Sequence, residues 1–200
     1  MSQTSWQIHE IEDCARMMVR EFWDANNQDQ QRSMHCLQAR WSPPPTGTYK
    51  AKFNAALFEE LHCAGLGIMY QDHSGQVITA LSQRIGLPHT VEMAEALAAR
   101  QGMEFARELS IFDVILEGDC LRIMRALNAS GGCNTLYGHV VNETKRLRAA
   151  LRHCSYQHVG RDGNKLAHCL ARRVVSTADI DVWVEDLPRD LDAMFQSDLS

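Results

Sequence analysis

Three consecutive prolines, at positions 43–45, constrain the fold of this 200-residue chain more than any other stretch of its sequence. Proline fixes the backbone angle φ and donates no backbone hydrogen bond, so a helix cannot run through this segment and an extended conformation is favoured. Because Gly47 follows shortly after, residues 41–48 are predicted to be a linker. We therefore expect a separate segment, residues 1–40, and a folded domain that begins at Tyr49.

The segment before the linker contains one amphipathic stretch. Apolar residues recur at steps of three and four between Ile8 and Phe22, with Glu and Arg between them. This spacing is typical of a helix with one apolar face. The pattern stops at Asn26 and Asn27. We expect a helical extension whose apolar face packs on itself or on a protein partner.

The composition excludes several classes of protein. Hydrophobic residues make up 45% and charged residues 22% of the chain, which is ordinary for a globular protein and too apolar for a largely disordered one. No apolar run approaches the roughly 20 residues of a membrane span, and the first residues lack the pattern of a secretory signal. Seven cysteines without a CxxC pair argue against a disulfide framework and a zinc module. We expect an intracellular protein with reduced thiols, in the nucleus or the cytoplasm, and no membrane association.

The net charge of −5 is unevenly distributed. Residues 179–200 hold seven acidic residues and one arginine, so this end carries −6 and the rest of the chain +1. A near-neutral body can still present a basic face to nucleic acid. We expect residues 188–200 to form an acidic tail outside the folded domain.

Hydrophobic patterns after the linker predict an α/β domain. The predicted strands cover residues 49–58, 64–70, 77–87, 113–119 and 155–159. The predicted helices cover residues 91–109, 121–129, 136–151 and 164–176. Thr90 is a suitable cap for the first of these helices, and Gly65 and Gly67 permit close backbone approach to the second strand. This order of elements requires a mixed five-stranded sheet with helices on its faces.

Two carboxylates are candidates for a magnesium site. Asp119 ends the apolar stretch ILEGD, and Glu95 lies early in the helix after Thr90, between Ala94 and Ala96. Carboxylates at strand ends and helix starts are common parts of Mg²⁺ sites in α/β proteins. The alternatives are a helix N-cap for Asp119 and a solvated helix carboxylate for Glu95.

A basic run in the predicted helix 136–151 is a candidate for contact with nucleic acid. Lys145, Arg148 and Arg152 follow each other at i, i+3 and i+7, the spacing of one helix face. Such a face could track a phosphate backbone. A solvated face paired with Glu143 is an equally good interpretation.

Five stretches of the sequence, in a fixed order, resemble one known family. They are YKAKFNAALF, CAGLGIMYQDHSGQVITALSQRI, HTVEMAEALAARQGMEFARELS, FDVILEGDCLRIMRAL and YQHVGRDGNKLAHCLAR. Together they resemble the plant ribonuclease H-like domain, which occurs in reverse-transcriptase polyproteins of plant retroelements and in stand-alone plant proteins. The resemblance begins near Tyr49, reaches Val184, and assigns residues 49–187 to this domain.

The resemblance implies a ribonuclease H-like fold and an enzyme that uses two Mg²⁺ ions to cleave the RNA strand of an RNA–DNA hybrid. Carried over by position, two metal-site carboxylates fall on Glu95 and Asp119. The fourth metal-site position falls on His168, where the plant group often has histidine. His158 falls on the histidine of the loop before the last helix, which implies proton handling or product release. Taken without the resemblance, His158 could close a strand and His168 could be a surface residue.

One catalytic position departs from the family pattern. The family has an essential aspartate in the first strand, roughly YKVNFDAAIF, where this chain has Asn54 in YKAKFNAALF. Asparagine has nearly the same shape, but it is neutral and offers one acceptor oxygen. Glu95 and Asp119 then supply −2 against the +4 of two Mg²⁺ ions, so Mg²⁺ binding is weakened. We expect a hybrid-binding protein of ribonuclease descent with impaired cleavage; the alternative is a non-catalytic module that binds nucleic acid or protein.

Overall fold

The computed structural model of the chain describes residues 42–176, 179–185, 187 and 191. They belong to a compact unit that spans Arg40–Ser200. The helix predicted between Ile8 and Phe22 lies outside the described residues, as does all of the predicted acidic tail except Leu191. Residues 42–48, the described part of the predicted linker, form no helix or strand.

The described residues form one sheet with helices on both faces, which confirms the predicted α/β class. The strands are β1 (Tyr49–Phe58), β2 (Cys63–Gln71), β3 (Val77–Gly86), β4 (Asp113–Gly118), β5 (His153–His158) and β6 (Ile180–Val184). The α-helices are α2 (Val91–Glu108), α3 (Leu121–Asn128), α4 (Gly138–Leu147) and α5 (Lys165–Arg173). Three short 3-10 turns are η1 (Glu59–Leu61), η2 (Arg148–Ala150) and η3 (Arg161–Gly163).

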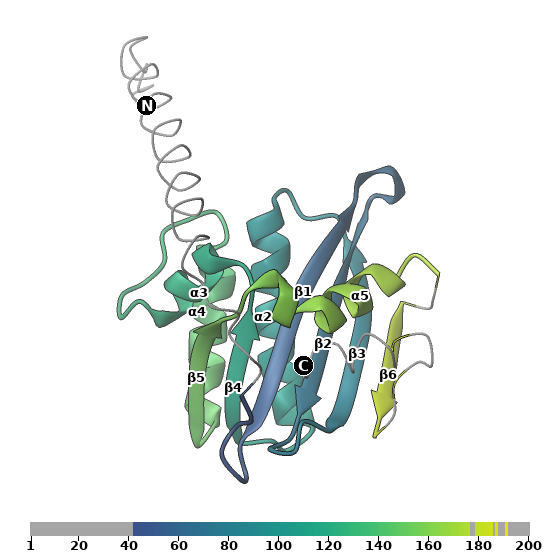
Figure 1. Cartoon of the computed structure of the whole chain (residues 1–200). Helices are drawn as coiled ribbons and strands as arrows, with labels where there is room; N and C mark the ends of the chain where they lie inside the picture. Colours follow the sequence, from purple (N-terminus) through teal and green to yellow (C-terminus); the bar gives the residue numbers. More distant parts are fainter. Residues whose placement is uncertain (1–41, 177–178, 186, 188–190, 192–200) are drawn as a thin grey trace. The chain divides into compact units, whose positions relative to one another are not determined.

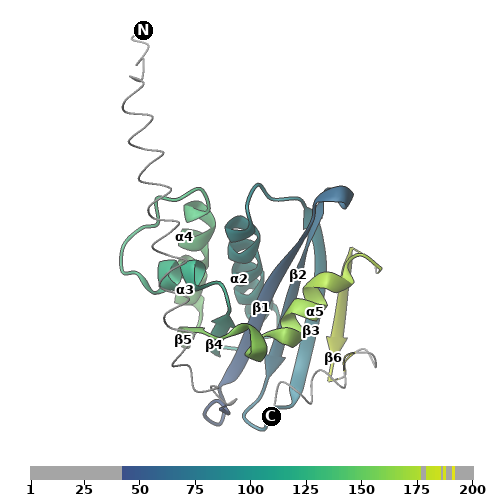
Figure 2. The same cartoon turned by 45° about the horizontal axis from the view of Figure 1, so that its top comes forward.

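The sheet is mixed and has the strand order β5-β4-β1-β2-β3-β6. β1, β2 and β3 form the predicted antiparallel meander, whereas β4 pairs parallel with β1, and β5 parallel with β4. Figure 1 shows α5 crossing one face of the sheet in front of β1 and β2, with α2 behind the sheet. In Figure 2 the same chain is turned, and α5 again lies on the opposite side of the sheet from α2.

The expectation of five strands is wrong, because β6 adds a sixth. It pairs antiparallel with β3, from Thr79 opposite Val184 to Gln83 opposite Ile180. Its residues alternate between exposed and half-buried, and the guanidinium of Arg173 lies 5.7 Å from the ring centroid of Trp183. Apolar and polar residues alternate only from Ile180 to Val182, so the sequence pattern does not predict this strand. The strand forms because β3 otherwise has an open edge of unpaired backbone groups.

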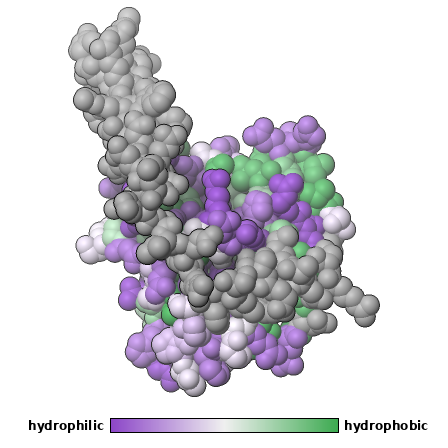
Figure 3. Space-filling model, in the orientation of Figure 1, coloured by the Kyte–Doolittle hydropathy of each residue, from purple (hydrophilic) through white to green (hydrophobic). Residues whose placement is uncertain are grey.

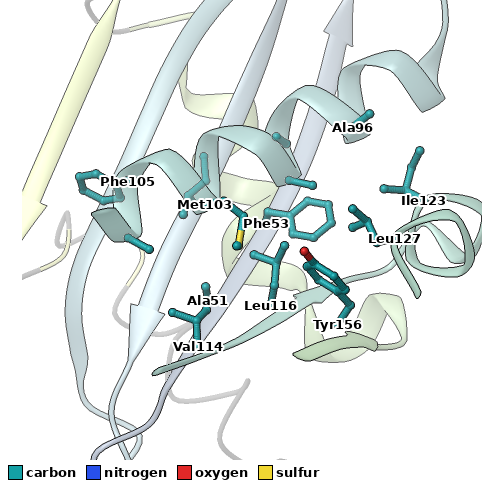
Figure 4. Close-up of a cluster of buried hydrophobic side chains, with 14 of the residues drawn as sticks. Ala51, Phe53, Ala96, Met103, Phe105, Val114, Leu116, Ile123, Leu127 and Tyr156 are labelled. Atoms are coloured by element: carbon teal, nitrogen blue, oxygen red, sulfur yellow. The ribbon is translucent and has the colours of Figure 1, made fainter. Parts of the chain in front are cut away.

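The main hydrophobic core lies between the sheet and helices α2, α3 and α4 (Figure 4). Alternate side chains of the strands point to this face, among them Phe53 of β1 and Leu116 of β4. They pack with Met103 of α2 and Ile123 of α3, all of them fully buried. This core holds α2 against the strands that carry the predicted site.

Two glycines of β2 determine how closely α5 lies on the sheet. A Cβ atom on Gly65 would stand 1.9 Å from the carbonyl oxygen of Ala171, and one on Gly67 would stand 2.1 Å from that of Ala167. Real Cβ atoms do not approach a backbone oxygen so closely, so any other residue would push the helix away. The predicted close approach at these glycines is confirmed.

Two further predictions concern membranes and cysteines. None of the helices in the described ranges is both long and apolar enough to cross a bilayer. All five cysteines in the described part of the chain are free thiols. They are Cys63, Cys120, Cys133, Cys154 and Cys169.

Candidate functional site

The predicted site residues surround the point where β1 and β4 separate. The two strands pair only through residues 49–52 and 114–117, and β1 then continues past the end of β4. Beyond that point the backbone groups of β1 that face β4 need other partners. The backbone N–H of Ala55 donates to Oε1 of Glu95 at 3.3 Å. Because the strands separate here, side chains from both faces of the sheet can reach the backbone of β1.

Asn54 connects three elements of the fold at this point. Its amide Nδ2 donates to Oδ1 of Asp119 at 2.8 Å, and its Oδ1 is 2.9 Å from Nδ1 of His168. Because an amide oxygen only accepts, His168 carries a proton on Nδ1 in this contact. Asn54 is only 3% exposed. A hydrogen-bonded chain thus runs from α5 through β1 to the residue that follows β4.

Asp119 is the centre of this set of contacts. Besides Asn54, its Oδ1 accepts a hydrogen bond from Nδ2 of Asn164 at 3.2 Å. Its backbone oxygen is 3.1 Å from Nε2 of His158. The N-cap interpretation of Asp119 is wrong, because Cys120 occupies the N-cap position of α3, and no side chain caps that helix.

Glu95 is the most buried carboxylate of the site. Thr90 caps α2 as predicted, with its hydroxyl accepting from the backbone N–H of Met93 at 3.1 Å, and Glu95 follows in the second turn. The Oε2 atom has no hydrogen-bond partner among the described residues. Burial, and next to it the charge of Asp119, raises the pKa of Glu95 to about 8. The interpretation as a solvated helix carboxylate is therefore wrong.

Asn164 is a site residue that the sequence analysis missed. Its Nδ2 donates both to the backbone oxygen of Phe53 at 2.9 Å and to Asp119. The side chain is almost fully buried, and its Oδ1 has no partner among the described residues. It stands four residues before His168, whose backbone N–H donates to the Asn164 carbonyl at 3.1 Å. This i, i+4 spacing was visible in the sequence, but an asparagine before a helix is usually a cap.

The residues present do not fit the two-ion site that the resemblance implies. Oδ1 of Asp119 already accepts from two amides, and Asn54 turns its nitrogen toward that carboxylate. Glu95, the other carboxylate, is buried, which favours its neutral form. Among the described residues, no group of three or more His, Cys, Asp or Glu side chains could hold a metal ion. Two amide N–H groups therefore lie beside Oδ1 of Asp119, where a donor group disfavours a cation.

The three basic residues predicted to share one helix face do not do so. α4 ends at Leu147, so Lys145 lies in the α-helix and Arg148 in the 3-10 turn η2. The Lys145 ammonium donates to the backbone oxygens of Ala129 and Gly131 at 2.7 and 2.9 Å. The guanidinium of Arg148 lies over the Tyr156 ring, 5.8 Å from its centroid.

The third member of that run lies outside the helix altogether. Arg152 precedes β5, and its Nε donates to Oδ2 of Asp113 at 2.9 Å. Glu143 does not pair with this run, since it accepts from Arg100 at 3.1 Å. The single helix face is therefore wrong, and the contact of these residues with nucleic acid stays a prediction.

Solved structures that resemble this chain include ribonucleases H. The crystal structure of RNase H1 from the halophilic archaeon Halobacterium salinarum has a TM-score of 0.60 and 22% identity, over 66% of this chain and 99% of that one. The N-terminal RNase H domain of a Mycobacterium tuberculosis protein has a TM-score of 0.56 and 20% identity, over 62% and 91%. LC11-RNase H1, isolated from compost and solved in complex with an RNA/DNA hybrid, has a TM-score of 0.56 and 16% identity, over 64% and 100%.

At these identities the structural likeness establishes the fold, which is ribonuclease H-like. No curated protein matches the chain. The sequence model of one family, described as reverse transcriptase-like, matches residues 52–174. That range begins within β1, ends just after α5, and contains every residue that meets at Asp119. The chain belongs to the reverse transcriptase-like family.

Proposed function

We propose that this protein binds RNA–DNA hybrids through its ribonuclease H-like domain and cleaves their RNA strand only weakly. The proposal follows from the family and from the fold shared with an RNase H1 that was solved with an RNA/DNA hybrid. We further propose that the protein descends from Mg²⁺-dependent ribonucleases of plant retroelements and that it is intracellular.

The hydrogen bond from Asn54 to Asp119 is the observation that supports impaired cleavage. At 2.8 Å, the amide nitrogen occupies a lone pair of the carboxylate that a divalent cation would need. The family pattern has an aspartate at this position, which would add a negative charge to the pair Glu95 and Asp119. Mg²⁺ prefers oxygen ligands in near-ideal octahedral geometry, so an amide N–H in that position disfavours the ion. The fold is unaffected, since asparagine and aspartate have nearly the same shape.

The alternative is a non-catalytic module that keeps the fold and binds nucleic acid or a protein. The observation that favours it is that both polar atoms of the Asn54 side chain already have a hydrogen-bond partner, Asp119 for Nδ2 and His168 for Oδ1. The Asn54 side chain therefore needs no cation to satisfy its polar atoms. The amphipathic stretch between Ile8 and Phe22 would supply the protein contact in this alternative.

The variant Asn54→Asp decides between the two functions. Cleavage of a labelled RNA–DNA hybrid in Mg²⁺ is measured for the natural chain, for Asn54→Asp and for Asn54→Asp combined with Asp119→Asn. We expect the single variant to cleave at least about a hundredfold faster, which corresponds to about 3 kcal/mol of transition-state stabilisation. The double variant loses this gain. Rapid cleavage by the natural chain would contradict the impairment, and a folded Asn54→Asp protein that cleaves no faster would favour the non-catalytic module.

A second readout of the same variants does not depend on activity. Asn54→Asp places two carboxylates in contact where the natural chain has a hydrogen bond. We expect its melting temperature to fall in EDTA and to recover with millimolar Mg²⁺, whereas the natural chain melts at the same temperature in both. A natural chain that Mg²⁺ stabilises strongly would show that Asn54 does not exclude the ion.

A further inference from the structure

The exposed side of α5 carries a basic face that begins at the polar site. Lys165, His168 and Arg172 are exposed, and they follow each other at i, i+3 and i+7 within one continuous helix. Residues at this spacing share a helix face, and the first and last stand about 10 Å apart along the axis. The opposite side of the helix is buried against the sheet. Its buried residues are Leu166, Ala167, Leu170 and Ala171.

The two permanent cations of this face have weak partners. The Lys165 ammonium lies 3.3 Å from a carboxylate oxygen of Asp162, whose side chain is 97% exposed. Ion pairs at such exposed positions contribute little, so a phosphate can replace the carboxylate. The guanidinium of Arg172 lies 5.9 Å from the centroid of the Phe58 ring. Stacking on a ring face fixes the plane of a guanidinium and leaves its edge available for hydrogen bonds.

The middle residue connects this face to the site. Nδ1 of His168 is 2.9 Å from Oδ1 of Asn54. The basic face is therefore in direct contact with Asn54, the hydrogen-bond partner of Asp119. Figure 3, viewed from the side that α5 crosses, shows strongly hydrophilic side chains gathered near the centre of this face of the molecule. A strand that occupied the site would therefore pass along α5.

We propose that the α5 face, defined by Lys165, His168 and Arg172, binds the sugar–phosphate backbone of the nucleic-acid strand that occupies the site. The inference rests on the proposed binding of nucleic acid and names the surface that performs it. A strand rises about 3.4 Å per phosphate, so the distance of about 10 Å between the two cations corresponds to about three steps. Contacts of this kind hold the strand in register and carry no sequence preference.

The test measures how salt weakens hybrid binding. Fluorescence anisotropy follows a labelled RNA–DNA hybrid in EDTA, from 50 to 300 mM KCl, with the full-length natural chain and with Lys165→Gln/Arg172→Gln. Each phosphate contact contributes about 0.9 to the slope of log K against log salt. We expect the double variant to lower that slope by about 2 and to weaken binding at least about tenfold at 0.1 M salt. The melting temperature of each variant shows that the fold is intact.

Two matched controls separate the possible outcomes. Arg107→Gln/Arg125→Gln removes two exposed charges, one from α2 and one from α3, and is expected to keep the natural slope. Arg172→Lys keeps the charge on α5 and is also expected to keep the natural slope. A natural chain that binds the hybrid with a slope unchanged by the α5 substitutions, or lowered as much by the Arg107 and Arg125 substitutions, would overturn this inference alone. A natural chain that does not bind the hybrid would overturn the proposed function together with it.

Discussion

Two basic runs of this chain have identical spacing and different environments. The α4 run is Lys145, Arg148 and Arg152, and the α5 run is Lys165, His168 and Arg172; both follow i, i+3 and i+7. In the α4 run the helix stops after its first member, so the three residues lie in α4, in η2 and just before β5. In the α5 run all three residues lie in one helix and remain exposed.

The difference teaches that regular spacing predicts a shared face only where the helix continues. α4 gives way to the turn η2 because the chain must enter β5 at His153, and Leu151 already has an extended backbone with ψ of 151°. α5 continues because β2 supports it at Gly65 and Gly67. Tertiary contacts therefore decide which of two similar runs becomes a surface.

The largest effect is expected at Gly67 of β2, against which α5 packs. Gly67→Val puts a side chain where Cβ would stand 2.1 Å from the carbonyl oxygen of Ala167 in α5. We expect the free energy of unfolding, measured in urea, to fall by at least about 3 kcal/mol, because the helix must move off the sheet. Gly132→Ala, next to the α4 run, meets no atom within 4 Å and is the control. A Gly67→Val protein of natural stability would show that the glycine does not fix the helix.

The second prediction concerns the buried carboxyl of Glu95, which belongs to the site that His168 of the α5 run reaches. The pKa of Glu95 is about 8 in the folded chain and near the ordinary 4.5 when unfolded. The folded state thus prefers the protonated form, so its stabilising contribution is complete below pH 4.5 and is lost as pH rises through 8. We expect unfolding free energies to fall by several kcal/mol over this window, and Glu95→Gln to flatten the profile. Asp119→Asn should shift the loss to lower pH; an unchanged profile in Glu95→Gln would contradict the assignment.

The third prediction compares the loss of stability when Asn164, before α5, or Asn142, in α4, is replaced by alanine. Asn164→Ala removes the donor to the buried backbone oxygen of Phe53 and one of the two donors to the half-buried Asp119. We expect a loss of about 1 to 2 kcal/mol in thermal or urea unfolding. Asn142→Ala, near the α4 run, removes a half-buried contact whose Oδ1 accepts from the backbone N–H of Cys133 at 3.1 Å. The loss there should be smaller, since water can reach the freed group; equal losses would remove the distinction between the two sites.

The smallest effect is expected at the end of the α4 run. Hydrogen bonding and charge from Arg152, together with His153, hold the pKa of Asp113 below its usual value. Arg152→Ala should raise this pKa toward the ordinary value, which NMR titration of the carboxyl carbon can follow. Because the folded pKa is lowered, the contact stabilises the fold above pH 3.8 and loses this contribution as pH falls. A pKa that does not move would mean that His153 alone is responsible.

Much of the fold could be predicted because its signals are local. The meander follows from short turns between strand-like stretches, and the start of α2 follows from Thr90, whose hydroxyl accepts from the nearby N–H of Met93. The position of Asp119 followed from the apolar stretch before it. The resemblance selected Asn54, Glu95 and His168, and the structure brings them to the same point.

Local patterns in the amino-acid sequence establish where the chain can bend, which faces are apolar and which side chains could meet. Tertiary structure alone decided the sixth strand, the end of α4 and the role of Asn164. In each case a backbone or side-chain group needed a partner distant in sequence: the open edge of β3, the entry into β5, and the carbonyl of Phe53 left free by β4. An unpaired buried polar group costs about 1 to 3 kcal/mol, which outweighs the small local preferences that a sequence pattern reports.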